Sequence, residues 1–491
     1  RCRELGIQPT FTRDQEGRMN ENAGKYKGLK VEEARRKIEE DLKEMGILVK
    51  QEEIIHSQPI CWRSKNPIEF VPMKEFYLKQ VEFKKRLLEL ADEMKFYAPF
   101  SKQLLINWIN SLSMDWPISR RRYYGTEIPL WYCKKCGYVY VPEPGKYYRP
   151  WKEKPPIESC PKCGSKEFEG EKRVFDTWFD SSNSQFYILG YLWDKEFFQK
   201  NFPCSLRPQG KEIVRTWLYF SLLKSFLLFG QKPFENVWIH FHVVDEKGEK
   251  MSKSLGNVID PQEVLEKYGA EAFRIWVCLE GDISKGDIRC SFRKIEGCSK
   301  FLTKLWNIAR FISRFPIPEE AELMPSDKWI LGELSKLVRQ VEKEFEEYSF
   351  FNGVTAIRNF AWNIFASHYI EMVKKRAYGE GFEEKEQKAA WYTLHTCLKT
   401  ILKLLAPAIP FITDVLWRKL YGEKSIHVEE FPKPEWSEEL CSLTEKLIQF
   451  NSKVWDEKKK RGMSLKENIS IEIPSELSIF EKDLRAMHNI Q

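Results

Sequence analysis

The sequence lacks any uninterrupted apolar segment long enough to cross a lipid bilayer. Such a segment needs about 20 residues, and one of the most apolar stretches, residues 218–230, already contains Lys224. The first 28 residues also lack the charged-then-apolar pattern of an export signal, and the chain opens on Arg1 rather than on methionine. We therefore expect a cytoplasmic protein without membrane segments, and the opening residue is compatible with a truncated start.

A strong charge of one sign and a disulfide pattern are missing as well. The net charge is +7 over 491 residues, which permits a polyanionic partner but does not indicate one. Twelve cysteines in a chain of this length do not form a disulfide scaffold, and four of them make two Cys-x2-Cys pairs. This usage indicates thiolate chemistry in a reducing compartment.

Material for large cores is abundant. Hydrophobic residues make up 42% of the chain and aromatic residues 14%, which excludes an intrinsically disordered protein. The length is about four times the commonest domain size, which indicates several domains. Short apolar runs at 237–244 and 273–279 alternate with helical stretches at 213–228 and 261–268. This alternation predicts α/β units with parallel strands, whose ends commonly bind phosphates or nucleotides.

The remaining regions differ from this pattern. Residues 54–72 are interrupted by prolines and predict strands and turns. Beyond Ile295, successive apolar faces at helical spacing predict a helical bundle. A linker with three prolines, residues 315–326, leads into this bundle, and we expect Ser326 and Asp327 to cap the helix that follows it.

A metal site is indicated by four cysteines with the spacing Cys-x2-Cys-x23-Cys-x2-Cys. A glycine follows each pair, and the surrounding residues 131–170 contain too few periodic apolar residues for a core. Four thiolates suit zinc, and a closed four-sulfur set leaves no open position for catalysis, so a structural role is expected. The predicted ligands are Cys133, Cys136, Cys160 and Cys163.

The most informative motif is a short loop with two lysines and two serines. It lies between an expected strand ending near Val244 and an expected helix near Pro261. Lysine ammonium groups can neutralise charge that develops on phosphoryl oxygens, and hydroxyl and amide groups add donors. Taken alone, the motif is equally compatible with a solvated turn. Its residues are Lys250, Met251, Ser252, Lys253 and Ser254.

This loop resembles the signature loop of class I aminoacyl-tRNA synthetases, and further segments resemble the same family in the same order. Residues 115–129 resemble the entry to the second half of the catalytic domain. Residues 176–182 resemble the amino-acid pocket, and residues 209–217 resemble the segment that faces the adenylate. Together these segments span nearly the whole chain.

Within the class, several segments most resemble synthetases of the archaeal valyl type. The isoleucyl and leucyl enzymes remain alternatives, because the three groups share most of these motifs. Residues 455–459 belong to the resemblance, although the same five residues are equally compatible with an ordinary charged helix face. The segments are residues 176–182, 206–210, 295–297, 299–302, 304–307 and 455–459.

The sequence departs from the family pattern in two ways. The His-x-Gly-His motif that binds ATP phosphates in class I enzymes is absent, since His240 and His242 precede the lysine loop rather than opening a helix. Residues 14–29 resemble the end of the editing insertion of these synthetases. We therefore expect an incomplete or split synthetase part that is inactive without an N-terminal half.

The resemblance implies a reaction and a role for individual residues. ATP with Mg²⁺ and an amino acid would give an aminoacyl-adenylate, and Lys250 and Lys253 would stabilise the pyrophosphate charge. The apolar and polar walls of the amino-acid pocket would be Val174, Asp176 and Trp178. Besides residues 250–254, the ATP-binding residues would be Gln209, Gly210, Glu212 and His240.

The expected fold is multidomain, α/β followed by all-α. It would combine the C-terminal half of a class I Rossmann-like nucleotide-binding domain, a zinc knuckle insertion and a helical anticodon-binding domain. In that domain Lys374, Lys375 and Arg376 are candidate phosphate contacts. The expected parts are residues 1–50 (end of the editing insertion), 51–130 (catalytic segment), 131–172 (zinc knuckle), 173–297 (second catalytic half with the lysine loop) and 298–491 (helical domain with a short tail).

The partners implied by the resemblance are valine, ATP, the valine tRNA and a separate N-terminal synthetase chain. A rival interpretation is a non-catalytic, zinc-stabilised tRNA-binding module, favoured by the missing His-x-Gly-His half. The intact lysine loop and pocket segment favour the enzyme, since a pure binding module gains nothing from an ATP loop.

Overall fold

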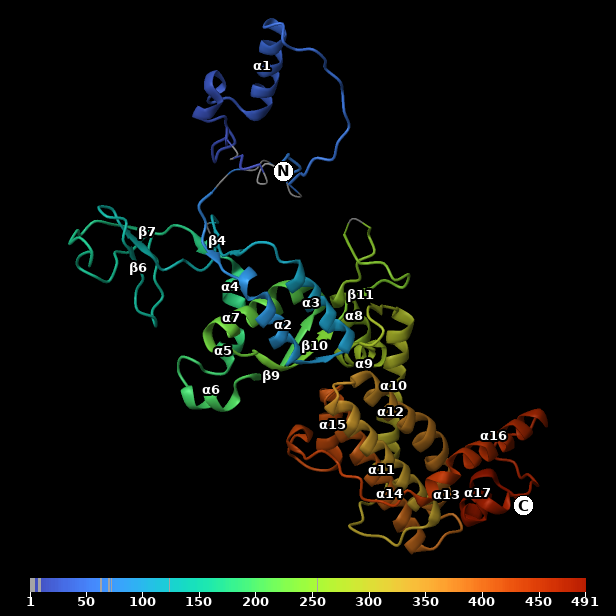
Figure 1. Ribbon diagram of the computed structural model, residues 1–491. Helices are drawn as coiled ribbons and strands as arrows, with labels where there is room; N and C mark the ends of the chain where they lie inside the picture. The colour runs from blue at the N-terminus through green and yellow to red at the C-terminus, as the bar shows by residue number, and fades with distance from the viewer. Residues whose placement is uncertain are drawn as a thin grey trace. The chain divides into compact units, whose positions relative to one another are not determined.

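The computed structural model describes residues 5–7, 10–61, 64–68, 71, 73–122, 124–253 and 255–491 (Figure 1). The chain divides into two compact units. The first comprises residues 1–83 and 112–181, and the second comprises residues 84–111 and 182–491. Among the described residues, no helix combines the length and apolar character that a membrane span requires.

The first unit is built from short elements. Its strands pair antiparallel as β1 with β3, β4 with β8, and β6-β5-β7 in a three-stranded sheet. Described residues between 54 and 72 show one isolated bridge, Ile60 to Pro67, in place of the strands expected there. The elements are η1 (Glu21–Tyr26), α1 (Val31–Glu44), β1 (Tyr77–Leu78), η2 (Val81–Phe83), β3 (Trp116–Pro117), β4 (Ser119–Arg120), β5 (Trp131–Cys133), β6 (Val139–Tyr140), β7 (Phe168–Gly170), β8 (Val174–Phe175) and α4 (Thr177–Ser181).

A parallel sheet lies at the start of the second unit, as the sequence predicted. Its strand order is β2-β10-β9, with β10 in the middle and both pairings parallel. Helices that follow or precede these strands cover them (Figure 1). The elements are α2 (Lys84–Asp92), β2 (Lys95–Tyr97), η3 (Pro99–Ser101), α3 (Lys102–Ser111), α5 (Ser184–Ile188), α6 (Lys195–Asn201), β9 (Cys204–Gly210), η4 (Lys211–Ile213), η5 (Val214–Leu218), α7 (Tyr219–Phe229) and β10 (Phe234–His240).

The expectation of a strand at residues 273–279 was wrong. These residues lie in α9 (Ala270–Glu280), which follows α8 (Pro261–Tyr268). Ala272, Ile275 and Trp276 are fully buried, and their spacing of three and one residues is that of a helix face. A short apolar run does not distinguish a strand from a buried helix. Here the segment packs against the helical core, and this packing favours the helix. The small parallel pair β11 (Val243–Val244) and β12 (Ile288–Arg289) flanks this region.

Helices make up the rest of the second unit and share one hydrophobic core. Helix α10 runs unbroken through residues 297 and 298, where the expected catalytic and anticodon-binding parts meet. The elements are α10 (Phe292–Ile312), α11 (Pro325–Glu346), α12 (Phe350–Asn359), η6 (Phe360–Tyr369), α13 (Ile370–Tyr378), α14 (Glu384–Leu405), α15 (Pro410–Leu420), η7 (Ile426–Val428), η8 (Glu439–Leu443), α16 (Thr444–Lys460), η9 (Ser475–Phe480) and α17 (Glu481–His488).

The start of α11 differs from its expected cap. Met324 occupies the N-cap position and Pro325 the first helical position, where a missing N–H costs nothing. Asp327 lies inside the first turn, and its Oδ2 accepts a hydrogen bond from the Met324 N–H at 3.0 Å. Asp327 therefore caps the helix from the third position, while Ser326 and Asp327 are both buried.

Candidate functional site

The predicted nucleotide site lies where two parallel strands of the second unit end together. In the register of β9 and β10, Gly210 lies opposite His240 and Gln209 opposite Ile239. Ligands of open α/β sheets bind beyond the carboxyl ends of the strands. The backbone therefore brings Gln209, Gly210 and His240 to the edge of the sheet where a nucleotide is expected.

Gly210 leaves room for the carboxylate that follows it. A Cβ atom at this position would lie 2.4 Å from Glu212 Oε2, so any larger residue would displace that carboxylate. Glu212 Oε2 also lies 3.4 Å from His242 Nε2. Gln209 is 3% exposed, and its Oε1 has no hydrogen-bond partner among the described residues. Glu212 and Gln209 thus both present oxygen acceptors at this edge.

Two residues that the motif analysis did not single out tie the strand ends together. Lys211 Nζ lies 2.6 Å from Asp287 Oδ1, which also accepts a hydrogen bond from the His242 N–H at 2.9 Å. Burial acts to raise the pKa of Asp287, but Lys211 and the His242 amide outweigh it and lower the pKa. The charged carboxylate of Asp287, which directly precedes β12, thus contacts Lys211 after β9 and His242 after β10.

The lysine loop follows β11 and precedes α8, as expected. Lys250 bridges to Val244 through the backbone, and the side chains of Lys250 and Lys253 are exposed. Within the described part of the chain, neither ammonium group forms an ion pair. Met251 packs against the hydrophobic core, and its Sδ accepts a hydrogen bond from the Ile259 N–H at 3.5 Å. The predicted Ser254 lies outside the described residues.

The loop is held by a carboxylate and an amide that sequence reasoning missed. Asn257 Oδ1 accepts a hydrogen bond from the Ser252 N–H at 2.9 Å, and Asn257 Nδ2 donates to Asp245 Oδ2 at 3.0 Å. One sequence signal was available, because a Gly-Asn pair is typical of a turn with side-chain hydrogen bonds. In the structure Gly256 adopts a φ of 66°.

The expected amino-acid pocket lies in the first unit. A cavity of about 240 Å³ is lined by Val174, Asp176 and Trp178, all three of the predicted residues. The backbone places them together, since β8 pairs with β4 and continues into α4. Arg120, Arg122, Tyr124, Phe175 and Thr177 line the same cavity.

Asp176 is the most constrained residue of this pocket. Its side chain is nearly buried, and Oδ2 accepts hydrogen bonds from Arg120 and, at 3.4 Å, from Trp116 Nε1. Oδ1 accepts a hydrogen bond from the Trp178 N–H at 3.0 Å. These contacts fix the carboxylate and, through the backbone, the start of the helix that carries Trp178.

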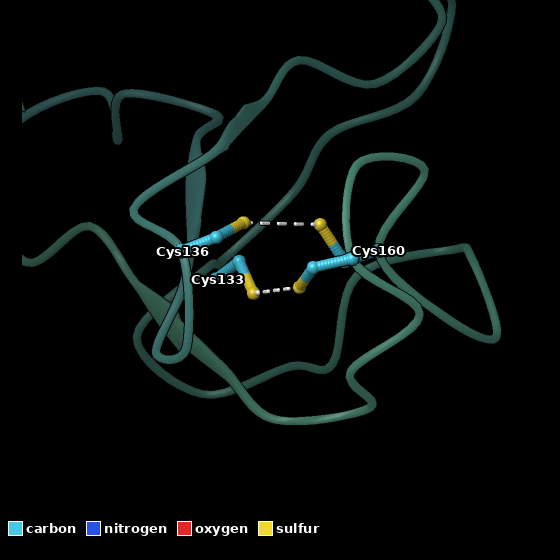
Figure 2. Close-up of side chains that lie close together, drawn as sticks. Cys133, Cys136 and Cys160 are labelled. Atoms are coloured by element: carbon cyan, nitrogen blue, oxygen red, sulfur yellow. Dashed lines mark hydrogen bonds between the residues drawn. The ribbon is translucent and has the colours of Figure 1, made fainter.

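The four predicted zinc ligands converge (Figure 2). Their sulfur atoms all lie within 4.8 Å of one another, and the Cys133–Cys163 and Cys136–Cys160 pairs are 3.6 Å apart. A tetrahedral zinc site with Zn–S bonds of about 2.3 Å requires sulfur atoms about 3.8 Å apart. The arrangement therefore fits a four-coordinate metal.

The pKa shifts within the cluster differ between the two cysteines of the first pair, because side-chain hydrogen bonds with the other cysteines raise the pKa of Cys136 to about 12 while that of Cys133 is lowered. Burial acts to raise the pKa of the Cys133 thiol, but the backbone N–H groups of Cys136 and Lys135 outweigh it and lower the pKa to about 6. Backbone amides that favour the thiolate prepare the sulfur for metal binding. Of the described His, Cys, Asp and Glu side chains, these four cysteines are the group that the structure gathers tightly enough for a metal ion.

Comparison with known proteins agrees with this geometry. Residues 13–291 match the family model of class I tRNA synthetases (I, L, M and V), and residues 327–473 match that of the anticodon-binding domain of tRNA ligases. The chain is similar to a valine–tRNA ligase from Aeropyrum pernix, with 44% identity over 99% of this chain and 60% of that protein. It is also similar to a valine–tRNA ligase from Pyrobaculum aerophilum, with 47% identity over 99% of this chain and 62% of that protein. The chain thus spans about three fifths of the length of these relatives.

Solved structures support the fold. A Mycobacterium tuberculosis methionyl-tRNA synthetase in complex with methionyl-adenylate superposes with a TM-score of 0.56 and 17% identity, over 74% of this chain and 66% of that chain. The expected fold class is confirmed, with a class I catalytic-type domain and a helical anticodon-binding domain. The chain belongs to the class I tRNA synthetases, in the family that comprises the isoleucine, leucine, methionine and valine enzymes.

Proposed function

We propose that the chain is part of a valine–tRNA ligase, which activates valine with ATP and transfers it to the valine tRNA. The observation that carries this proposal is the lysine loop, whose two lysine side chains are exposed and which follows directly after β10 and β11. The similarity to two valine–tRNA ligases over 99% of the chain supports valine over isoleucine and leucine.

The chemistry needs no protein nucleophile. A carboxylate oxygen of valine attacks the α-phosphorus of ATP, a new P–O bond forms, and the bond to pyrophosphate breaks. Magnesium bound to the ATP phosphates supplies charge neutralisation when present. Lys253 and Lys250 would stabilise the negative charge that develops on pyrophosphate, since preorganised cations act where charge appears in the transition state.

The other candidate residues would position the substrates. Glu212 and Gln209 offer oxygen acceptors for the ribose hydroxyl groups, and Gly210 lets the nucleotide approach the strand end. His240, at the same edge, offers a ring nitrogen. Val174 and Trp178 would wall the side chain of valine, and the Asp176 carboxylate would fix that wall. Holding reactants in this way contributes to the rate through orientation.

The activity test is valine-dependent exchange of pyrophosphate into ATP. We expect negligible exchange by the 491-residue chain alone, and exchange when it is supplied with the remaining part of a valine–tRNA ligase. In the reconstituted enzyme Lys253→Ala should lower the exchange rate by roughly 10²-fold, the effect of removing one preorganised donor. Lys247→Ala, at an exposed lysine in the preceding turn, is the matched control and should leave the rate unchanged.

Exchange supported by isoleucine or leucine rather than valine would overturn the choice of amino acid. Wild-type exchange retained by Lys253→Ala would overturn the role of the loop. A reconstituted protein that binds tRNA but never exchanges pyrophosphate would instead support the non-catalytic binding module.

We propose that Cys133, Cys136, Cys160 and Cys163 hold one structural zinc ion. The first unit has little core of its own around the three short strands β5, β6 and β7, so metal binding would supply folding free energy there. Elemental analysis of the purified chain should find about one zinc per chain. Cys160→Ser with Cys163→Ser should abolish it, whereas Cys61→Ser, at a cysteine outside the cluster, should not. Unchanged zinc in the double variant contradicts the assignment.

We propose that the helical part binds the valine tRNA. Phosphate contacts make such binding weaken steeply with added salt, whereas base contacts carry the preference for one tRNA. A titration of the whole chain against valine and leucine tRNAs at two salt concentrations should show lower affinity at higher salt for both and a retained preference for the valine tRNA. Equal affinities at the higher salt would contradict specific recognition.

A further inference from the structure

The turn that precedes the lysine loop is organised by one carboxylate. Asp245 Oδ1 accepts hydrogen bonds from the N–H groups of Lys247 at 3.0 Å and Glu249 at 2.8 Å. The Asp245 N–H donates to the Glu249 carbonyl at 3.0 Å, which closes the turn. One oxygen of this carboxylate therefore fixes residues 245–249, and the other, Oδ2, remains for a partner outside the turn.

That partner is Asn257, which lies twelve residues later, beyond the lysine loop. Its Nδ2 donates to Asp245 Oδ2 at 3.0 Å and approaches the Lys250 carbonyl at 3.4 Å, while its Oδ1 accepts from the Ser252 N–H at 2.9 Å. The hydrogen bond from Asn257 is the first of the contacts that lower the pKa of Asp245, followed by backbone amides of the turn. One amide side chain thus bridges the turn and the loop.

These contacts determine where the lysine side chains begin. The Lys250 carbonyl and the Ser252 N–H flank Met251, whose side chain is anchored in the hydrophobic core. With the backbone held on both sides of Met251, Lys250 and Lys253 project from a defined position although their side chains are exposed. An unrestrained loop would spread the two charges over many positions and lose the advantage of preorganisation.

We propose that Asn257, paired with Asp245, is a positioning residue that holds the lysine loop in the conformation that presents Lys250 and Lys253. The proposal rests on the function proposed above for the loop, but the pairing itself is a property of this chain. Asparagine is suited to the task because its side chain both donates and accepts. Aspartate at the same position would accept from Ser252 but would repel the Asp245 carboxylate.

Limited proteolysis of the 491-residue chain tests the pairing without any activity. Trypsin cleaves after Lys250 and Lys253 only when the loop opens locally. Loss of the hydrogen bonds that hold the loop predicts that Asn257→Ala accelerates this cleavage roughly tenfold. Asn257→Asp and Asp245→Asn should each accelerate it as well. Asn201→Ala, at an asparagine at the end of α6 that bonds to the Phe197 carbonyl, should leave it unchanged.

The exchanged pair is the decisive variant. Asp245→Asn combined with Asn257→Asp keeps one carboxylate and one amide, and it keeps acceptors for the Lys247, Glu249 and Ser252 amides. We expect this double variant to return toward the wild-type cleavage rate. Asn257→Ala cleaved at the wild-type rate, or a double variant cleaved faster than both single variants, would overturn the pairing.

Kinetics of the reconstituted enzyme test the consequence. Asn257→Ala should lower kcat for pyrophosphate exchange about tenfold while changing KM for ATP less than about threefold, because the lysine charges act mainly in the transition state, and the double variant should recover. An active wild type with an unimpaired Asn257→Ala would overturn the positioning role. An inactive wild type whose trypsin pattern follows the expectation would overturn the proposed function and leave the pairing supported.

Discussion

Two buried arginines in the second unit are stabilised in opposite ways. Arg376 in α13 is fully buried, and its guanidinium contacts the Asp327 carboxylate at 2.7 and 2.8 Å. It also contacts Ser326 Oγ at 3.1 Å and the Asp483 carboxylate at 3.2 Å. The helical core therefore contains one cation between two carboxylates, all supplied by its own helices and their termini.

Arg207 in β9 is 3% exposed and has a different environment. Its guanidinium lies over the rings of Trp217 at 3.7 Å and Phe234 at 4.2 Å. Its Nη2 donates to neutral groups, including Gln185 Oε1 at 3.2 Å, and its Nη1 has no partner among the described residues. Aromatic faces and dipoles stabilise this cation, and no ion pair of the described chain includes it.

The difference appears in the pKa values of the two groups. Burial acts to lower the pKa of Arg376, but Asp327 and Asp483 outweigh it and raise the pKa. Burial lowers the pKa of Arg207, and no carboxylate offsets it. A buried ion that is paired on several sides leaves costly partners behind when it is removed, whereas an unpaired one leaves neutral groups.

The largest expected effect is that of Arg376→Met. Removal of the guanidinium leaves Asp327 and Asp483 buried without a counter-ion, which should lower the free energy of unfolding by about 3–5 kcal/mol. Hydrogen exchange of amides in α11 and α13 would measure this loss in the helical part. Lys374→Met, at an exposed residue of the same helix, should change exchange little. A loss below about 1 kcal/mol for Arg376→Met would contradict the comparison.

The pH dependence of the stability should reveal a second buried polar cluster in the helical part, which contains His488 and Asn451. His488 Nε2 bonds Asn451 Oδ1 at 2.8 Å, and burial, followed by Lys458 and His368, lowers the pKa of His488 to about 4. Because this pKa lies below the unfolded value of about 6.5, His488 contributes stability that is present above pH 6.5 and lost as the pH falls toward 4. The loss should reach roughly 3 kcal/mol.

His488→Gln keeps an N–H donor for Asn451 and cannot take up a proton in this range. We expect its stability to fall less than that of the wild type between pH 6.5 and 4. Burial raises the pKa of Asp483 to about 6, so Asp483 acts in the opposite direction, but it is present in both proteins. The difference between the two unfolding curves therefore isolates His488, and identical acid dependence would contradict its buried neutral state.

The smallest expected effect is that of Arg207→Met. The variant loses cation–π contacts worth about 0.5–2 kcal/mol but also removes the cost of burying an unpaired charge. We expect a change in the free energy of unfolding within about 1 kcal/mol, measured by hydrogen exchange in β9 and α7. A loss as large as that of Arg376→Met would show that Arg207 has a charged partner.

Sequence reasoning succeeded where the signal is local. The two Cys-x2-Cys pairs predicted a site whose sulfur atoms converge, because each pair and its glycine form a turn of fixed geometry. Helix α8 lies at the expected residues 261–268, whereas the strand expected at 237–244 is divided between the end of β10 (Phe234–His240) and β11 (Val243–Val244). The segment at 273–279 was misread, because a short apolar run fits a buried helix as well as a strand.

Burial of charged residues could not be read from the sequence. Arg376 was a candidate phosphate contact beside Lys374 and Lys375, but it is fully buried against Asp327 and cannot reach a phosphate. Lys458 was compatible with a charged helix face, but it is 1% exposed and donates to the carbonyls of Leu465, Glu467 and His488 at 2.7–2.8 Å.

The sequence by itself determined the composition of the sites, namely the four cysteines, the lysine loop and the order of α/β and helical regions. These features depend on spacing along the chain, which sets turn and helix geometry directly. The tertiary structure decided which side chains act on each other over distance. The pairing of Asp245 with Asn257 and of Arg376 with Asp483 joins residues whose separation of 12 to 107 positions carries no periodic signal. For Arg376 and Asp483 the packing of the helices also removes water, which strengthens the interaction between their charges.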